Sequence, residues 1–257
     1  MTDTCICITG ASSGLGKALA LGLAAPGRHL ILAGRDMNRL DEVRRAATDS
    51  GAMVTCVCGD LCQEQELHCL EAVIQEMRPD LLFLNAGMGR YGRFVETPLE
   101  PSEAIVTLNV LAVVRLVKRW SDAMLAAHKS GKVVFIASTA AFLPLPGQGV
   151  YGASKAFIVS FAEALRFELR SSGLEVLTIC PGYFKTRFQQ RAAGKAAQEV
   201  DESEAKKMAQ KIIKRLKKTG VYVPFPWRWL LLLRYLLPSQ LRNWIVEKRM
   251  VSHQVVK

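Results

Sequence analysis

Short apolar runs alternate with amphipathic segments along most of the chain. The apolar runs have the length of buried strands, and they are Cys5–Thr9, Leu30–Ala33, Met53–Cys58, Leu81–Leu84, Val133–Ala137, Val176–Cys180 and Val221–Val223. Between them, apolar residues recur at helical spacing in Asp36–Ser50, Gln63–Met77, Pro101–His128 and Tyr151–Ser171. This alternation predicts a parallel sheet, because parallel strands need long crossover connections that cover both of its faces.

The expected fold class is therefore α/β, with a Rossmann-like, doubly wound, parallel sheet of seven strands and helices on both faces. Residues 1–223 would form a single domain, and about 182–202 would be its substrate loop. Residues 224–257 would add a basic and hydrophobic helical extension at the C-terminus. A chain of 257 residues in which half the residues are apolar can bury one core of this size.

The net charge of +11 is concentrated near the C-terminus. Residues 201–257 hold 13 Lys and Arg against 4 Asp and Glu, whereas residues 1–200 hold 21 against 19. Such a patch suits an acidic partner, and a solvated helix face explains it equally well. Charge without a nucleic-acid module argues against specific nucleic-acid binding.

Residues 203–238 combine a basic helix with a stretch rich in tryptophan and leucine. The stretch Pro224–Pro238 is too short to span a bilayer, but its Trp227, Trp229 and Tyr235 favour the headgroup level of a membrane. We expect peripheral membrane association through 203–238, slightly ahead of a subunit contact or a cover over the substrate cleft. The first strand begins almost at once, so no signal peptide is expected, and the location would be the cytoplasm or the cytosolic face of a membrane.

Seven cysteines lie at positions 5, 7, 56, 58, 62, 69 and 180. The odd number, the apolar neighbours and the absence of a CxxC pair predict free thiols in a reducing compartment. Cys56, Cys58 and Cys62 lie close in sequence, but no histidine pair supports them as ligands. We expect no metal.

A glycine-rich turn joins the first strand to the first helix. It contains Gly10, Ser12, Ser13, Gly14, Leu15 and Gly16. Glycine lets the backbone turn sharply and approach a pyrophosphate, and the N-terminus of the following helix attracts that anion. The second strand ends in Gly34 and Arg35, where an NAD site usually has a carboxylate. Arg35 favours the 2′-phosphate of NADP(H), and Asp36 is interpreted as the N-cap of the next helix.

Three side chains predict proton-transfer chemistry. Ser138 follows the fifth strand at its carboxyl end, where α/β sheets bind ligands. Tyr151 and Lys155 are four residues apart and share a helix face. The Lys155 ammonium would lower the pKa of the Tyr151 phenol, making it a usable proton donor and acceptor. Ser138 would stabilise charge on the substrate oxygen.

These motifs together resemble the classical short-chain dehydrogenases/reductases over roughly residues 4–190. The shared features are the Thr9–Gly16 turn, Asp60-Leu61, Asn85-Ala86-Gly87, Asn109, Ser138, Tyr151-x-x-x-Lys155 and Pro181-Gly182. Leu84 departs from the family, which often has a second asparagine there. Membrane-associated lipid- and steroid-handling branches look similar in their C-terminal part.

The resemblance implies a role for each matched position. Asp60 would bind the adenine, Asn85, Ala86 and Gly87 would lie beneath the cofactor, and Asn109 would hold a water that connects Lys155 to solvent. Lys155 and Tyr151 would contact the cofactor, and Pro181, Gly182 and Thr186 would surround the nicotinamide and pyrophosphate. Assembly as a homodimer or homotetramer is also implied.

The expected activity is hydride transfer between NADP(H) and a ketone or secondary alcohol, with Tyr151 moving the proton. Apolar residues near the predicted site, among them Phe142, Leu145, Tyr183 and Phe184, favour a hydrophobic substrate such as a lipid, acyl or steroid-like compound that would also contact Ser138 and Tyr151. The alternative is a non-catalytic NADP(H)-binding sensor or scaffold on the same fold.

Overall fold

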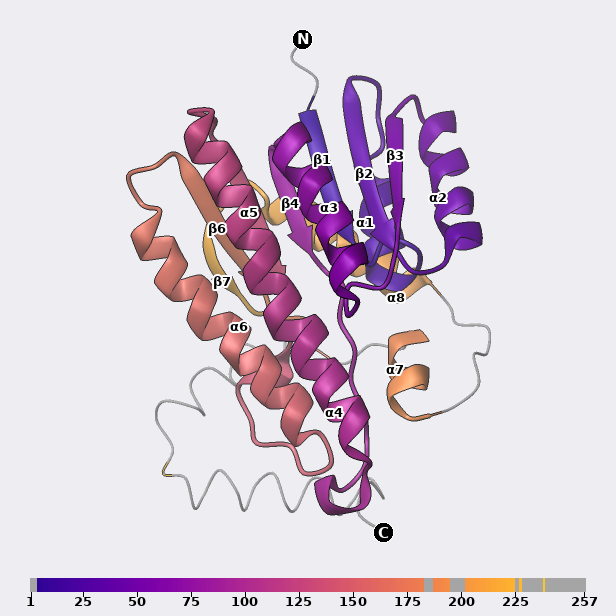
Figure 1. The fold of residues 1–257 in the computed structure, drawn as a ribbon, viewed down its shortest axis with the longest axis vertical. Coiled ribbons are helices and arrows are strands. Elements are labelled where there is room, and N and C mark those ends of the chain that lie inside the picture. The colour runs from indigo at the N-terminus through magenta and orange to yellow at the C-terminus, as the bar shows by residue number, and fades with distance from the viewer. Residues whose placement is uncertain (1–3, 183–186, 195–201, 225–226, 228–237, 239–257) are drawn as a thin grey trace.

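Seven strands form one parallel sheet in a computed structural model that describes residues 4–182, 187–194, 202–224, 227 and 238 (Figure 1). The spatial order is β3-β2-β1-β4-β5-β6-β7, which confirms the predicted doubly wound sheet. The strands are β1 (Thr4–Thr9), β2 (Arg28–Gly34), β3 (Met53–Cys58), β4 (Leu81–Leu84), β5 (Gly131–Ile136), β6 (Leu174–Ile179) and β7 (Gly220–Tyr222).

Helices cover both faces of this sheet. On one face pack α1 (Gly14–Leu23), α2 (Met37–Asp49) and α8 (Ser203–Arg215). On the other pack α3 (Glu64–Met77), α5 (Ala112–Ala126) and α6 (Gly149–Glu168), with α4 (Leu99–Val106) running into α5 (Figure 1). Each face has its own buried apolar cluster, as a sheet covered on both sides requires.

The segment predicted as one helix from Pro101 to His128 is interrupted in the structure. A π-helical turn at Thr107–Leu111 separates α4 from α5, and Asn109 lies within it, 1% exposed. Such turns are often found at functional sites. The helix also begins two residues before Pro101, which is tolerated in a first turn because the missing N–H has no partner there.

The ends of β1 and β4 are joined by side-chain hydrogen bonds. The Thr9 hydroxyl donates to the Phe83 carbonyl (3.2 Å) and accepts from the backbone N–H groups of Asn85 and Ala86 (2.9 Å each). The Asn85 amide donates to the carbonyls of Thr9 (2.9 Å) and Gly10 (3.3 Å). These bonds fix the crevice between two strands whose following helices lie on opposite faces.

Gly16 lies against this junction. A Cβ atom at position 16 would lie 2.1 Å from the Gly10 carbonyl oxygen and 2.6 Å from the Asn85 amide nitrogen. No side chain fits at that distance, so Gly16 permits the close approach of α1 to the end of β1.

We predict that Gly16→Ala lowers the free energy of unfolding by about 2–3 kcal/mol, although alanine is the better helix former. Gly149→Ala is the matched control, because a Cβ there meets nothing within 4 Å, and its change should stay within about 0.5 kcal/mol. Urea unfolding followed by circular dichroism measures both. Equal stabilities of the two variants would contradict the packing role of Gly16.

Candidate active site

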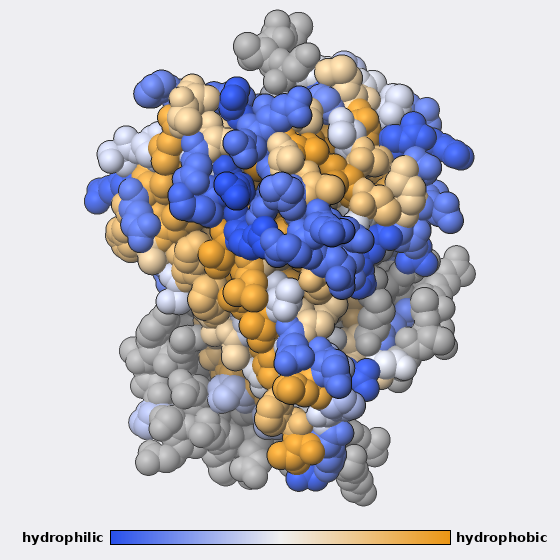
Figure 2. Space-filling view, viewed as in Figure 1, coloured by the Kyte–Doolittle hydropathy of each residue, from blue (hydrophilic) through white to orange (hydrophobic). Residues whose placement is uncertain are grey.

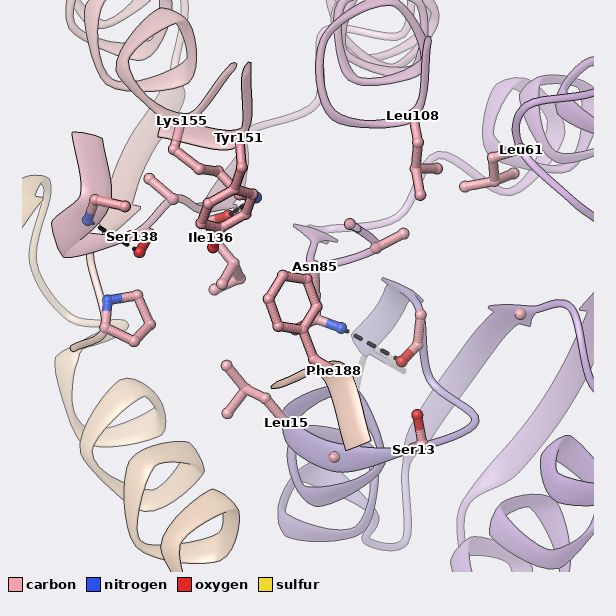
Figure 3. Close-up of a pocket in the computed structure, with 18 of the residues that line it drawn as sticks. Ser13, Leu15, Leu61, Asn85, Leu108, Ile136, Ser138, Tyr151, Lys155 and Phe188 are labelled. Carbon is pink, nitrogen blue, oxygen red and sulfur yellow. Dashed lines mark hydrogen bonds between the residues drawn. The ribbon is translucent and has the colours of Figure 1, made fainter. Parts of the chain in front are cut away.

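A cavity of about 610 Å³ opens at the carboxyl edge of the sheet. Figure 3 shows Ser138, Tyr151 and Lys155 grouped at one end, Ser13 toward the other and Phe188 between them. Most of the sequence-predicted residues line this cavity, namely Gly10, Ser12, Ser13, Gly14, Leu15, Arg35, Asp60, Asn85, Ala86, Gly87, Ser138, Leu145, Tyr151, Lys155, Pro181 and Gly182.

Of the predicted residues that the structure describes, three do not line it. Phe142 is 3% exposed and belongs to the apolar core, and its role as a substrate contact stays a prediction. Phe142 is the C-cap of the short helix Thr139–Ala141, and its side chain packs in the apolar cluster on the α5 and α6 side of the sheet. Gly16 has the packing role described above, and Asn109 lies behind Gly87. Tyr183, Phe184 and Thr186 fall outside the described residues.

One end of the cavity is the N-terminus of α1. Ser13 caps the helix with extended backbone, and its side chain makes no capping hydrogen bond. Gly14 has φ +54°, and a Cβ built on it would meet nothing within 4 Å. The first N–H groups of α1 and the positive end of its dipole therefore border the cavity with nothing packed over Gly14. This backbone fits a pyrophosphate.

Arg35 and Asp36 take the places that the sequence predicted. The Asp36 side chain accepts the backbone N–H of Arg39, which confirms it as the N-cap of α2. Arg35 pairs with Asp60 at 3.3 Å, and both side chains are partly exposed. Burial alone would raise the pKa of Asp60, but the Cys62 N–H and the Arg35 guanidinium together hold it below its ordinary value.

Arg39 also lines the cavity, a residue that the sequence analysis missed. It lies one turn into α2 and pairs with Asp36 at 3.2 Å. The sequence could have indicated Arg39, because it follows Arg35 by four residues and α2 begins between the two. Two guanidinium groups thus border the end of the cavity where a 2′-phosphate would lie.

The other end of the cavity is built by α6 and the loop after β5. A Cβ at Gly152 would lie 3.2 Å from the Ala140 carbonyl oxygen, so glycine lets α6 approach this loop closely. Tyr151 is thereby brought close to Ser138, whose hydroxyl lowers the pKa of the phenol. Ser138 follows β5, as predicted, and its hydroxyl also accepts the Ala140 N–H at 3.1 Å.

The pKa of Tyr151 moves in the direction opposite to the one predicted from the sequence. Burial raises it above the ordinary value of a phenol, and the hydrogen bond with Ser138 offsets only part of that rise. The Lys155 ammonium nitrogen lies 5.9 Å from the centroid of the Tyr151 ring. A raised pKa keeps Tyr151 protonated at neutral pH, which suits a proton donor.

Lys155 is itself 6% exposed and has a perturbed pKa. Its ammonium group donates to the Ile136 carbonyl at 3.0 Å, and burial lowers its pKa to about 8. A buried lysine with a lowered pKa beside a tyrosine is typical of a functional site, because burying a charge destabilises the fold.

Asn109 connects three segments behind the cavity. Its amide oxygen accepts the Met88 N–H (2.9 Å), and its amide nitrogen donates to the Met88 carbonyl (2.9 Å) and to the Ser154 hydroxyl (3.0 Å). A Cβ at Gly87 would lie 3.2 Å from the Asn109 oxygen and 3.3 Å from the Lys155 nitrogen. Both polar groups therefore face the same small space.

Further residues line the substrate end that the sequence analysis did not name as part of the site. Leu143 and Gln148 precede α6, Tyr91 follows β4, Phe188 comes from α7 (Arg187–Ala192), and Trp227 follows β7. The Phe188 ring lies 5.6 Å from the Tyr151 ring. No local sequence pattern indicated Phe188, because its position depends on how α7 packs.

The cysteines and acidic residues form no metal site that the structure describes. All seven cysteines are free thiols. Within the described segments, no group of three or more His, Cys, Asp or Glu side chains could hold a metal ion.

A sequence model of the short chain dehydrogenase family matches residues 4–197. The chain belongs to this family. An uncharacterized oxidoreductase of Myxococcus xanthus is 34% identical over 189 residues, which are 70% of this chain and 72% of that one. A probable oxidoreductase, EphD, of Mycobacterium tuberculosis is 30% identical over 188 residues; the match covers 72% of this chain and only 32% of EphD. The chain thus matches about a third of the length of this mycobacterial relative.

Solved structures of related proteins share this fold. A short-chain dehydrogenase from Sphingobium yanoikuyae in complex with NADPH has a TM-score of 0.79 at 28% identity, covering 99% of this chain and 96% of that one. A bulky-bulky ketone specific alcohol dehydrogenase from Comamonas testosteroni scores 0.74 at 26%, covering 100% and 96%. A Burkholderia phymatum relative in complex with NAD scores 0.78 at 25%, covering 96% and 95%. One of these neighbours is thus in complex with NADPH and another with NAD.

We predict that Lys155→Met stabilises the fold at pH 7 while reducing activity. The pKa of Lys155 falls from 10.5 to about 8 on folding. Keeping Lys155 charged in the folded parent therefore costs about 3 kcal/mol of stability below pH 8. The methionine variant avoids this cost, but it loses about 1 kcal/mol with the hydrogen bond of Lys155. Between pH 8 and 10.5 the unfolded chain holds the extra proton, and parent stability should rise toward that of the variant.

Urea unfolding of both proteins from pH 7 to 10.5 measures this difference, in which the titration of the buried thiols largely cancels. Lys118→Met is the matched control, since Lys118 is 70% exposed and its substitution should change stability by no more than about 0.5 kcal/mol. A Lys155→Met protein less stable than the parent at pH 7 would contradict the account.

Proposed function

We propose that this chain is an NADP(H)-dependent oxidoreductase that acts on a hydrophobic ketone or secondary alcohol of the lipid, acyl or steroid-like kind. The observation that carries the proposal is the meeting of Ser138, Tyr151 and Lys155 at one end of a cavity whose other end is a helix N-terminus. A family relative bound to NADPH and one specific for bulky ketones support it.

Different residues of the cavity would bind different parts of the cofactor. The α1 N-terminus would hold the pyrophosphate, Arg35 and Arg39 the 2′-phosphate, and Asp60 the adenine. Asn85, Ala86 and Gly87 would lie beneath it, with Pro181, Gly182 and Thr186 at the nicotinamide end. When bound, the nicotinamide supplies or accepts the hydride. Residues 1–223 would form this catalytic domain, with 182–202 as its substrate loop.

The chain's own residues would move the proton. In the reductive direction Tyr151 donates its phenolic proton to the substrate oxygen, which Ser138 holds by a hydrogen bond. The Lys155 ammonium then stabilises the phenolate that remains. Asn109 and Lys155 face the same space beside Gly87, which supports a role for Asn109 in returning the proton through a water molecule.

We predict that Tyr151→Phe reduces kcat at least a thousandfold because the proton donor is lost, while the Kd for NADPH stays within threefold. Oxidation of NADPH with a panel of ketones of graded chain length measures the first, and calorimetry the second. Full turnover by the phenylalanine variant would contradict the proposal, and a parent that binds NADPH without reducing any ketone would favour the sensor.

We predict that the double variant Arg35→Ala, Arg39→Ala raises the KM for NADPH about 10- to 100-fold, because two charge-assisted contacts to the 2′-phosphate are lost. The KM for NADH should change less than threefold. Arg44→Ala is the matched control from the same helix, since Arg44 pairs with Asp41 and does not line the cavity. Equal effects on both cofactors would contradict the preference for NADP(H).

Two surfaces support proposals about partners. The exposed face of α8 and the residues after it carry six cations and suit an anionic membrane at the cytosolic face; they are Lys206, Lys207, Lys211, Lys214, Lys217 and Lys218. Apolar side chains are exposed on α4, on the π-helical turn after it and on α6, and they suit a homodimer or homotetramer; they are Leu99, Val106, Leu111 and Phe157. Figure 2 shows apolar surface on this side of the molecule. Among the described helices, none is long and apolar enough to cross a bilayer.

We predict that the chain floats with phosphatidylserine vesicles and not with phosphatidylcholine vesicles. The triple variant Lys206→Glu, Lys207→Glu, Lys211→Glu should lose this flotation, because the attraction is electrostatic.

Light scattering before vesicles are added should give the mass of two or four chains. Flotation unchanged by the charge reversal, or a mass of one chain, would contradict the corresponding proposal.

A further inference from the structure

Trp227 lies at the carboxyl edge of the sheet because of the strand that precedes it. β7 pairs in parallel with β6, and the Cys180 N–H donates to the Tyr222 carbonyl at 2.8 Å just beyond that pairing. Both strands therefore deliver the residues that follow them to the same edge. After β7 the chain turns at Pro224, whose carbonyl accepts the Trp227 N–H at 2.9 Å.

The indole of Trp227 packs flat on Gly182, which follows β6. A Cβ at Gly182 would lie 2.1, 2.4 and 2.6 Å from the indole atoms Nε1, Cδ1 and Cε2. Distances this similar to three bonded ring atoms place that Cβ over a face of the five-membered ring, because approach to its edge would leave two of them much farther away. Only glycine permits so close a contact, so the indole lies directly against the backbone of residue 182.

The same indole borders the substrate end of the cavity. Trp227 lines it together with Pro181, Tyr151 and Phe188, and it also packs against the core cluster beneath. The sequence favoured the headgroup level of a membrane for Trp227, whereas in the structure its side chain lies half-buried against Gly182. The family match ends at residue 197, so Trp227 belongs to a part of the chain outside it.

We propose that Trp227 is a specificity-determining residue that binds the flat ring of an aryl or polycyclic ketone in preference to a flexible alkyl chain. The inference rests on the proposed function, whose ketone shares this cavity with the cofactor. An indole already packed against Gly182 and the core cluster loses little conformational freedom when a ligand contacts it. Ring-on-ring contact adds affinity beyond the apolar area buried, which an alkyl chain of equal carbon number does not gain.

The test compares two methyl ketones with equal carbon number, 2-acetonaphthone and 2-dodecanone. Calorimetry measures their Kd with the Tyr151→Phe protein saturated with NADPH, so that binding is read without turnover. Adding Trp227→Ala should raise the Kd of 2-acetonaphthone about tenfold and that of 2-dodecanone less than threefold, whereas Trp227→Phe should keep both within about threefold. In the otherwise unchanged protein, the same shift should appear in KM more than in kcat.

Phe167→Ala, an exposed aromatic substitution outside the cavity, is the control and should change neither Kd. Melting temperatures identify any variant that fails to fold, and Trp227→Phe then carries the comparison with the parent. Equal loss for both ketones would overturn the proposal, as would tighter binding of 2-acetonaphthone by Trp227→Ala, which would make the indole a size limit. Binding as predicted without turnover in the parent would contradict the proposed function alone.

Discussion

The Asn85 amide lies between the ends of β1 and β4, and the rest of the site depends on the geometry it sets. Its two hydrogen bonds to the carbonyls of Thr9 and Gly10 hold the turn after β1 against the end of β4. That contact leaves no room for a side chain at Gly16, so α1 starts directly above the junction. The N-terminus of α1 and the chain after β4 then border the same cavity, which is where an anion and the ring attached to it would have to lie.

The two ends of this cavity differ in how deeply their charged and polar side chains are buried. At the nucleotide end, Arg35, Arg39, Asp36 and Asp60 are partly exposed and paired only at the surface, so a phosphate can replace an acidic partner at little cost. At the catalytic end, burial raises the pKa of Tyr151 and lowers that of Lys155. The fold therefore gives up stability to keep a protonated phenol beside a cation that is easily neutralised.

The sequence predicted the parts of this architecture that depend on local pattern. The seven strands follow from continuous apolar runs, and the Asp36 cap and the spacing of Tyr151 and Lys155 follow from helix geometry. Tertiary contacts decided the rest. The π-helical turn that contains Asn109 occurs together with the hydrogen bonds of Asn109 to Met88 and Ser154. Phe142 is buried in the core. Trp227 lies against Gly182 because the strand before it, β7, pairs with β6. The pKa of Tyr151 was misjudged because its sequence neighbours do not reveal how deeply the phenol is buried.

The central claim is that one nucleotide spans the cavity from α1 to Tyr151. A crystal structure of the chain with NADPH tests it most directly. The account predicts the pyrophosphate on the backbone of Gly10–Leu15, the 2′-phosphate at Arg35 and Arg39, and the nicotinamide beside Tyr151 and Lys155. A nucleotide bound in the reverse direction, or outside this cavity, would contradict it.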